Sequence, residues 1–213
     1  MVYGLLYHTS HYVTITAYSK KEFFNMNKKN ITLVCVGIAL LSLQLIINIS
    51  GIYIDIFNDI LAFILIAIGG FPLTKRNNIF KKSGRIIVIG LILTFTAQLL
   101  SIYSSILGLS NIVTIMCGLS VIVNIYYTYY FNEGLILEAK FQEKEALTRS
   151  IRMIWALYGI LVFLSFIATM AGIRMVTIAA NALSLIYCIF YISNILNISK
   201  QLYMEGLPTK HMM

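Results

Sequence analysis

The chain alternates between long apolar stretches and short polar connections. Six of the stretches reach the roughly 20 residues that an α-helix needs to cross the hydrocarbon core of a bilayer. Strand-like alternation is absent from them, and lipid offers no water to backbone groups, so each stretch is expected to be a helix. The predicted spans are Ile31–Ser50, Ile54–Leu73, Ile86–Gly108, Asn111–Phe131, Met153–Gly172 and Met175–Leu196.

The two ends of the chain fall outside this pattern. Residues 1–25 have no unbroken apolar core of signal-peptide length, and the composition changes at Met26. We interpret residues 1–25 as an extension that is poorly ordered or results from an upstream start. Residues 26–200 are predicted to form the six-helix transmembrane bundle, and residues 201–213 a cytoplasmic tail.

The basic residues share one side of the predicted bundle. All 16 Lys and Arg residues except Arg174 lie before the first span, in every second connection, or after the last span. If the spans alternate in direction, these segments lie on the same side of the membrane, and an excess of positive charge marks that side as the cytoplasm. The sequence therefore predicts an all-α integral membrane protein of three hairpins, with both termini cytoplasmic.

Composition supports the membrane class and excludes nucleic-acid binding. Charged residues make up 11% of the chain and hydrophobic residues 59%, whereas about 25% of a soluble domain is charged. The net charge of +8 lies in connections between apolar stretches rather than on one polar face. It therefore fits attraction to anionic lipids, with the lipid bilayer as partner and no nucleic acid.

Charged side chains at membrane depth are candidate functional residues. Asp55 and Asp59 are four residues apart, which places both carboxylates on one face of the second span. Arg174 is the one basic residue on the same side of the membrane. A cation or substrate site, an Asp–Arg ion pair, and capping of a helix N-terminus are the alternatives.

Several side-chain amides also lie within or near the spans. They are Gln44, Asn48, Gln98, Asn124 and Asn181. Amides hydrogen-bond between membrane helices, and each contact contributes only about 0.6–2 kcal/mol, so ties between helices are one interpretation. A polar cavity lined by Gln44, Gln98 and Asn181 is the other, and it requires three helices to meet at one depth.

The connection between the fourth and fifth spans, residues 132–152, is the longest. Helix-forming residues fill it, so the fourth span is expected to continue as a charged helix that is either solvated or docks a partner. Trp155 lies at a matching depth to tyrosines at the end of the fourth span, and an interfacial aromatic belt is expected there. The tyrosines are Tyr126, Tyr127, Tyr129 and Tyr130.

Catalytic and metal-binding patterns are missing from the sequence. No His lies in a predicted span, and the chain has neither a GxxxxGK[ST] loop nor a GxSxG elbow. Cys35, Cys117 and Cys188 lie in spans, where they behave as small apolar residues rather than as a disulfide framework. We therefore expect no catalytic residue, no metal site, no cofactor and no enzyme activity.

Two segments carry a loose but recognisable pattern. In FNDILAFILIAIGGFPLTKRNNIFKKSGR (Phe57–Arg85), an acidic residue opens a span, a Gly closes it, and a Leu/Phe/Lys-rich connection leads into the next span. FNEGLILEAKFQEKEALTRSIRMIW (Phe131–Trp155) forms a later connection. Both segments resemble those of small six-span integral membrane proteins of clostridia and related Firmicutes. The resemblance implies a helical bundle in a bacterial plasma membrane and assigns no activity.

Two classes of function follow. In the first, the protein binds or passes a small solute or ion, alone or as the membrane subunit of a transporter. In the second, it is a non-catalytic membrane partner or sensor that docks a cytoplasmic protein through its basic loops and residues 132–152. Either protein would be multi-pass in the bacterial plasma membrane. A solvated cavity lined by Gln44, Gln98 or Asn181 favours transport, and a solid apolar core counts against it.

Overall fold

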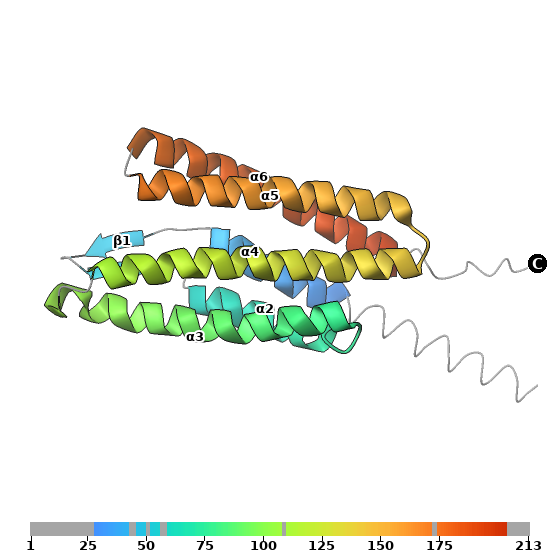
Figure 1. Cartoon of the computed structure of the whole chain (residues 1–213), viewed down its shortest axis with the longest axis horizontal. Helices are drawn as coiled ribbons and strands as arrows, with labels where there is room; N and C mark the ends of the chain where they lie inside the picture. Colours follow the sequence, from blue (N-terminus) through green and yellow to red (C-terminus); the bar gives the residue numbers. More distant parts are fainter. Residues whose placement is uncertain are drawn as a thin grey trace, which may run out of the picture.

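The computed structural model describes residues 28–42, 46–49, 52–55, 59–107, 110–171 and 174–203. These residues form six helices and one β-hairpin, so the fold is helical as expected (Figure 1). The proposed extension 1–25 and residues 204–213 of the tail lie outside the described residues. The elements are helix 28–42, β1 (Ile46–Ile49), β2 (Ile52–Asp55), α2 (Asp59–Leu73), α3 (Asn78–Leu107), α4 (Ser110–Phe141), α5 (Glu145–Met170) and α6 (Arg174–Tyr203).

The helices form a bundle with α4 between two outer pairs. Helix α4 packs on α3 on one side and on α5 on the other, α2 packs on α3, and α6 packs on α5 (Figure 1). The α2–α3 and α4–α5 connections lie at one end of the bundle, together with the end of α6 and the beginning of helix 28–42. We call this the basic end because Lys and Arg residues concentrate there. Strand β1 and the beginnings of α4 and α6 lie at the other end.

Three described helices are long and apolar enough to cross a membrane. They comprise Asn78–Leu100, Glu145–Ala168 and Met175–Tyr203, whereas the apolar helix Asp59–Leu73 is shorter. Large apolar side chains on these helices are exposed rather than buried, among them Ile92, Ile160 and Ile186. An apolar outer surface of this extent indicates a protein that associates with a membrane.

The sequence prediction is wrong for residues 46–55. Helix 28–42 ends before Ser50, and β1 and β2 pair antiparallel in the region assigned to the end of the first span and the start of the second. Ile46 pairs with Asp55 and Ile49 with Ile52. The physical reason is that the segment is dominated by β-branched Ile, which favours strands, although its hydropathy equals that of a membrane helix.

The helices at the basic end extend beyond the predicted spans. Helix α3 begins at Asn78 instead of Ile86, because the side-chain Oδ1 of Asn77 accepts hydrogen bonds from the backbone N–H groups of Ile79 and Phe80, at 3.0 and 2.9 Å. An Asn in this position caps a helix and allows a polar first turn. Hydropathy marks only the apolar part of such a helix, so it misses the turns outside the bilayer.

Helix α4 continues to Phe141, which agrees with the expected extension of the fourth span. It ends where Glu143 adopts a left-handed backbone conformation with φ of 58°. The backbone N–H of Lys144 then donates to the Ala139 carbonyl at 2.9 Å. This arrangement satisfies a carbonyl group at the helix end and turns the chain directly into α5.

Close contact between helix backbones shapes the core. A Cβ atom on Gly69 would overlap the backbone carbonyl oxygen of Asn30, and one on Gly37 would lie 2.7 Å from the Ala62 carbonyl oxygen. Glycine at these positions therefore lets helix 28–42 approach α2 closely, as small residues do between membrane helices. Aromatic side chains fill the space around α4, including the Phe80–Phe131 ring pair with centroids 6.0 Å apart.

Candidate functional site

A row of polar side chains lies inside the bundle along one face of α4. Asn124, Thr128 and Asn132 are spaced four residues apart, so they share this face, and all three are buried. The Thr128 hydroxyl donates to the carbonyls of Asn124 and Ile125, each at 3.0 Å. We call these three residues, together with Tyr127, Tyr158 and Tyr191, the polar row.

Tyrosines from α5 and α6 meet the row. The side-chain amide of Asn132 donates to the Tyr191 hydroxyl at 2.6 Å and to the Thr128 carbonyl at 2.6 Å. The Tyr191 ring stacks on the Tyr158 ring with centroids 4.6 Å apart. The Tyr158 hydroxyl lies 3.4 Å from the Ser42 hydroxyl of helix 28–42. The row therefore joins four helices through buried polar contacts.

Three oxygen atoms of the row have no hydrogen-bond partner among the described residues. They are Oδ1 of Asn124, the hydroxyl of Tyr127 and Oδ1 of Asn132. The exposed fractions of these residues are 8%, 0% and 2%. Leaving such a group unsatisfied costs about 1–3 kcal/mol, so these three oxygens mark a position where a buried water molecule or a ligand would gain hydrogen bonds.

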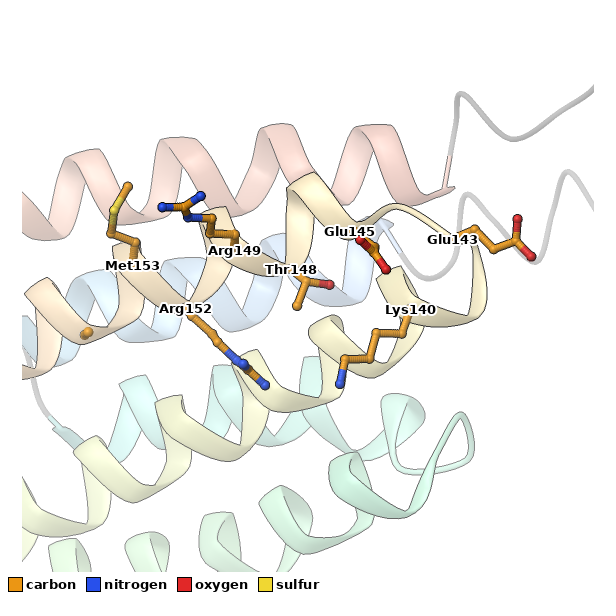
Figure 2. A pocket seen from close by; sticks show the side chains of 8 residues that line it. Lys140, Glu143, Glu145, Thr148, Arg149, Arg152 and Met153 are labelled. Carbon is orange, nitrogen blue, oxygen red and sulfur yellow. The ribbon is translucent and has the colours of Figure 1, made fainter.

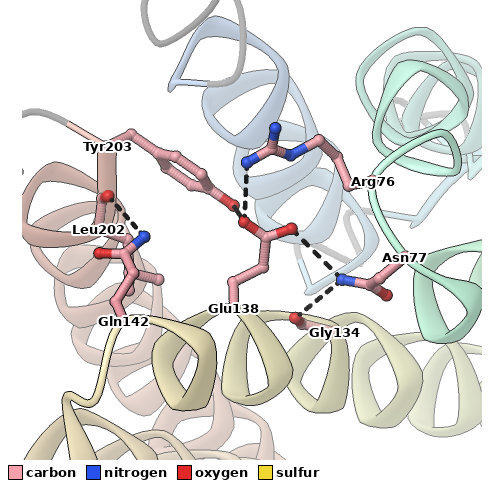
Figure 3. A network of polar contacts seen from close by, with 7 residues as sticks. All are labelled: Arg76, Asn77, Gly134, Glu138, Gln142, Leu202 and Tyr203. Carbon is pink, nitrogen blue, oxygen red and sulfur yellow. Dashed lines mark hydrogen bonds and ion pairs between the residues drawn. The ribbon is translucent and has the colours of Figure 1, made fainter.

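A second polar cluster closes the basic end. The carboxylate of Glu138 on α4 pairs with the guanidinium of Arg76 at 2.9 Å and accepts a hydrogen bond from the Tyr203 hydroxyl at 3.1 Å (Figure 3). Asn77 donates to the other carboxylate oxygen at 3.4 Å and to the Gly134 carbonyl at 3.3 Å. Because Glu138 is buried and fully engaged, this cluster ties the α2–α3 connection, α4 and α6 together.

The α4–α5 connection is also held on the bundle. Gln142 donates to the Leu202 carbonyl at 3.1 Å, and the Lys144 ammonium donates to the Gln201 carbonyl at 2.5 Å (Figure 3 shows the first). Cationic and amide donors at these carbonyls satisfy the end of α6. The connection predicted as the longest loop is thus a short turn fixed to α6.

An open groove of about 950 Å³ lies beside this connection, between the end of α4 and the start of α5 (Figure 2). Its lining combines charged residues with Thr148, Met153 and Ala156. The charged residues are Lys140, Glu143, Glu145, Arg149 and Arg152. The Thr148 hydroxyl is buried and has no hydrogen-bond partner in the described part of the chain. The lining thus carries three basic and two acidic side chains.

The structure places the charged sequence candidates at the end opposite the basic end. Asp55 is the last residue of β2 and Asp59 the first of α2, so they do not lie on one helical face as predicted. Asp59 is half-buried, and Arg174 is the first residue of α6. The side chains of Asp55 and Arg174 lie outside the described part of the structure, so their proposed ion pair stays a prediction.

The structure does not bring the amides Gln98 and Asn181 together. Gln98 is half-buried on α3, which packs on α2 and α4, whereas Asn181 is exposed on α6. The Asn181 amide oxygen accepts a hydrogen bond from the Ser165 hydroxyl of α5, which is the kind of interhelical tie that the sequence predicts. Gln44 lies outside the described residues.

The sequence reasoning missed most of the polar row and the Glu138 cluster. The sequence did contain a signal for the polar row, because Asn124, Thr128 and Asn132 recur at helical spacing along one face. It was obscured because residues after Phe131 were assigned to a charged extension. Asn124 was named from the sequence as a possible tie between helices, and it is buried in the row. Tyr127 was expected in the interfacial belt but is fully buried, whereas the Tyr129 and Trp155 rings do lie together, with centroids 5.0 Å apart.

Neither a search for metal ligands nor comparison with known proteins gives further evidence about the function. Among the residues that the structure describes, no three His, Cys, Asp or Glu side chains are grouped to hold a metal ion. Cys35 and Cys188 are buried and free. No protein-family model, no curated protein and no solved structure matches the chain.

Proposed function

We propose that this chain is a multi-pass protein of a bacterial plasma membrane that binds a small uncharged polar solute or a monovalent cation in the polar row. The single observation that carries the proposal is the set of three buried oxygen atoms without a partner in the described residues, on Asn124, Tyr127 and Asn132. Buried polar groups that lack a partner are costly, and inside a membrane-protein bundle they often belong to a functional site.

The chemistry of the row limits the ligand. Its unsatisfied atoms are two amide oxygens, which accept hydrogen bonds, and one phenol, which accepts or donates. No residue of the row is charged, so it offers neither a counter-ion for an anion nor the carboxylates that divalent cations prefer. A ligand with hydrogen-bond donors or a singly charged cation fits this set of oxygens.

The proposed orientation follows from the basic end. Lys75, Arg76, Lys140 and Lys200 lie at this end, and positive residues favour the cytoplasmic side. In this arrangement both termini are cytoplasmic, and six helices cross or enter the bilayer as three hairpins.

The alternative function, docking of a cytoplasmic protein by residues 132–152, has less support. Residues 132–141 continue α4, and the connection that follows is bound to α6 through Gln142 and Lys144. The turn itself therefore faces its own bundle rather than a partner, and the exposed charges of this segment lie along the groove between α4 and α5. We therefore place the ligand in the interior.

The test is ligand-dependent stabilisation of the purified full chain in detergent. The unfolding midpoint is followed by fluorescence of Trp155, the single tryptophan. The probes are Na⁺, K⁺ and N-methylglucamine as chloride salts, and glycerol, glucose and uracil as uncharged solutes. A ligand at about 100 times its Kd raises the free energy of unfolding by about 2.7 kcal/mol, so a saturable rise with one probe is expected.

Two matched variants test whether the stabilisation by a ligand arises in the polar row. Asn132→Leu removes one of the buried oxygens and should abolish the saturable rise. Asn194→Leu is the control, because the Asn194 amide donates to the Phe190 carbonyl of its own helix α6. The proposal fails if no probe stabilises the wild-type chain, or if the rise persists unchanged in Asn132→Leu.

A further inference from the structure

The groove between α4 and α5 combines basic side chains with a hydroxyl. Figure 2 shows Lys140 and Arg152 directed to the same side of the two helices, with Thr148 between them in sequence and in the view. Glu143 points away from both. Arg152 is held by a long contact of 3.7 Å to Glu133, and its side chain is 58% exposed. Most of its guanidinium donors are therefore available to an oxyanion.

Aromatic residues set the depth of the groove relative to a bilayer. Trp155 follows Arg152 by less than one helical turn, and its ring contacts the Tyr129 ring of α4. Tyr130 lies beside Tyr129, and the Lys82 ammonium lies 5.9 Å from the Tyr130 ring centroid. Trp and Tyr prefer the headgroup level of a membrane. Arg152 thus lies within about one turn of that level, at the depth of the lipid phosphates, and the rest of the groove extends outward along α4 and α5.

An apolar ridge runs from the groove along α5. Ala156, Ile160, Phe163 and Ile167 follow Arg152 at intervals of four, eight, eleven and fifteen residues, so they lie on one helical face. All four are exposed. A molecule whose anionic group occupies the groove can therefore extend an apolar chain along α5 without a break.

We propose that this groove binds an anionic phospholipid of the surrounding membrane, with its phosphate between Lys140 and Arg152 and an acyl chain on the ridge of α5. Arg149 also lines the groove, but its side chain is directed to the opposite side of α5 (Figure 2). Basic pockets between membrane helices at the cytoplasmic side select anionic headgroups. A free phosphate would use the cations but leave the ridge unoccupied. The continuity of charge, hydroxyl and apolar surface favours a lipid over either a free anion or a protein segment.

Quenching of Trp155 by brominated lipids tests the proposal on the full chain. The protein is reconstituted in phosphatidylcholine with increasing brominated phosphatidylglycerol, and in the reverse mixture, with identical acyl chains. The two series give the relative binding constant of the two lipids near Trp155. We expect phosphatidylglycerol to be preferred. The triple variant Lys140→Ala/Arg149→Ala/Arg152→Ala should reduce that preference by about thirtyfold or more, because the two basic groups at the phosphate each contribute about 1 kcal/mol of attraction.

Two control variants separate the groove from general surface charge. Lys75→Ala/Lys81→Ala/Arg85→Ala removes the same number of charges from exposed positions at the same end. It should change the preference near Trp155 by a clearly smaller factor, because these residues do not line the groove. Lys140→Arg/Arg149→Lys/Arg152→Lys keeps the charge and should retain the preference. Retention also shows that substitutions at these positions leave the fold intact.

Each remaining outcome overturns the proposal. Equal quenching by the two lipids in the wild-type chain would show that the groove does not select anionic headgroups. Equal losses in the two alanine triples would assign the effect to the basic end as a whole. Displacement of phosphatidylglycerol by inorganic phosphate alone would identify a site for free phosphate. Unchanged preference in the groove triple would leave the groove to a different partner, such as a protein segment.

Discussion

The Glu138 cluster predicts a large difference between two glutamates on the same helix. Glu138 pairs with Arg76 at 2.9 Å, with side chains 9% and 20% exposed, whereas Glu133 lies 3.7 Å from Arg152, with side chains 25% and 58% exposed. Both glutamates lie on α4 and pair with an arginine of another segment, so substitution of either Glu by Ala removes the same atoms. The main difference between the two pairs is burial, and burial determines how much stability each substitution removes.

The expected losses in the free energy of unfolding follow from this difference in burial. Removing one partner of a buried ion pair costs about 3–5 kcal/mol, because the other charge stays buried without compensation. We expect Glu138→Ala to lie near the lower limit, at about 3 kcal/mol, because Arg76 keeps some contact with water. An exposed pair contributes about 0–1 kcal/mol, so Glu133→Ala should cost less than about 1 kcal/mol.

The assay is unfolding of the detergent-solubilised chain with increasing sodium dodecyl sulfate, followed by circular dichroism and Trp155 fluorescence. The double variant Arg76→Ala/Glu138→Ala should be less destabilised than the sum of the single variants, because it removes both charges. A difference below about 1 kcal/mol between Glu138→Ala and Glu133→Ala would refute the reasoning, since Glu138 would then be effectively solvated.

Three further substitutions test local features of the fold in the same unfolding assay. Gly69→Ala should destabilise by about 1–3 kcal/mol because its Cβ would overlap the backbone of helix 28–42, whereas Gly159→Ala, whose Cβ would lie 3.8 Å from the Trp155 ring, should be tolerated. Asn77→Ala should cost about 1 kcal/mol through loss of the α3 cap, and an unchanged midpoint would contradict that role. Glu143→Gly should raise stability by about 0.5–1 kcal/mol because glycine adopts positive φ without strain, and a decrease would contradict this.

The helical class could be predicted from the sequence because apolar length is a local property. Helix α4 also continued past Phe131 as expected, since its residues favour helix. The β-hairpin at Ile46–Asp55 could not be predicted in this way, because hydropathy scores a run of Ile equally in a strand and in a membrane helix. Strand pairing depends on how two segments meet, and the apolar pattern does not contain that information.

The candidate sites depend even more on long-range packing. Glu138 belongs to a charged stretch, and only the meeting of α4 with Arg76 and Tyr203 makes it buried. Asp55 and Asp59 were selected on the assumption of one continuous helix, which the structure replaces with a strand end and a helix start. Burial of a polar group follows from its neighbours in space, so spacing alone identifies candidates without ranking them.

The orientation of the Asn132 amide strengthens the assignment of the polar row. One atom of this amide lies 2.6 Å from the Thr128 carbonyl oxygen, which only accepts hydrogen bonds, so that atom must be the donor Nδ2. The same Nδ2 lies 2.6 Å from the Tyr191 hydroxyl, so its two hydrogens are both engaged. The remaining amide atom is therefore an acceptor whose orientation is fixed. A ligand at this position has to donate a hydrogen bond or carry positive charge, whereas the groove at the basic end offers donors and cations to an anion. In the two proposals, the interior and the surface of the bundle thus select ligands of opposite character, so an anionic lipid would not compete for the polar row.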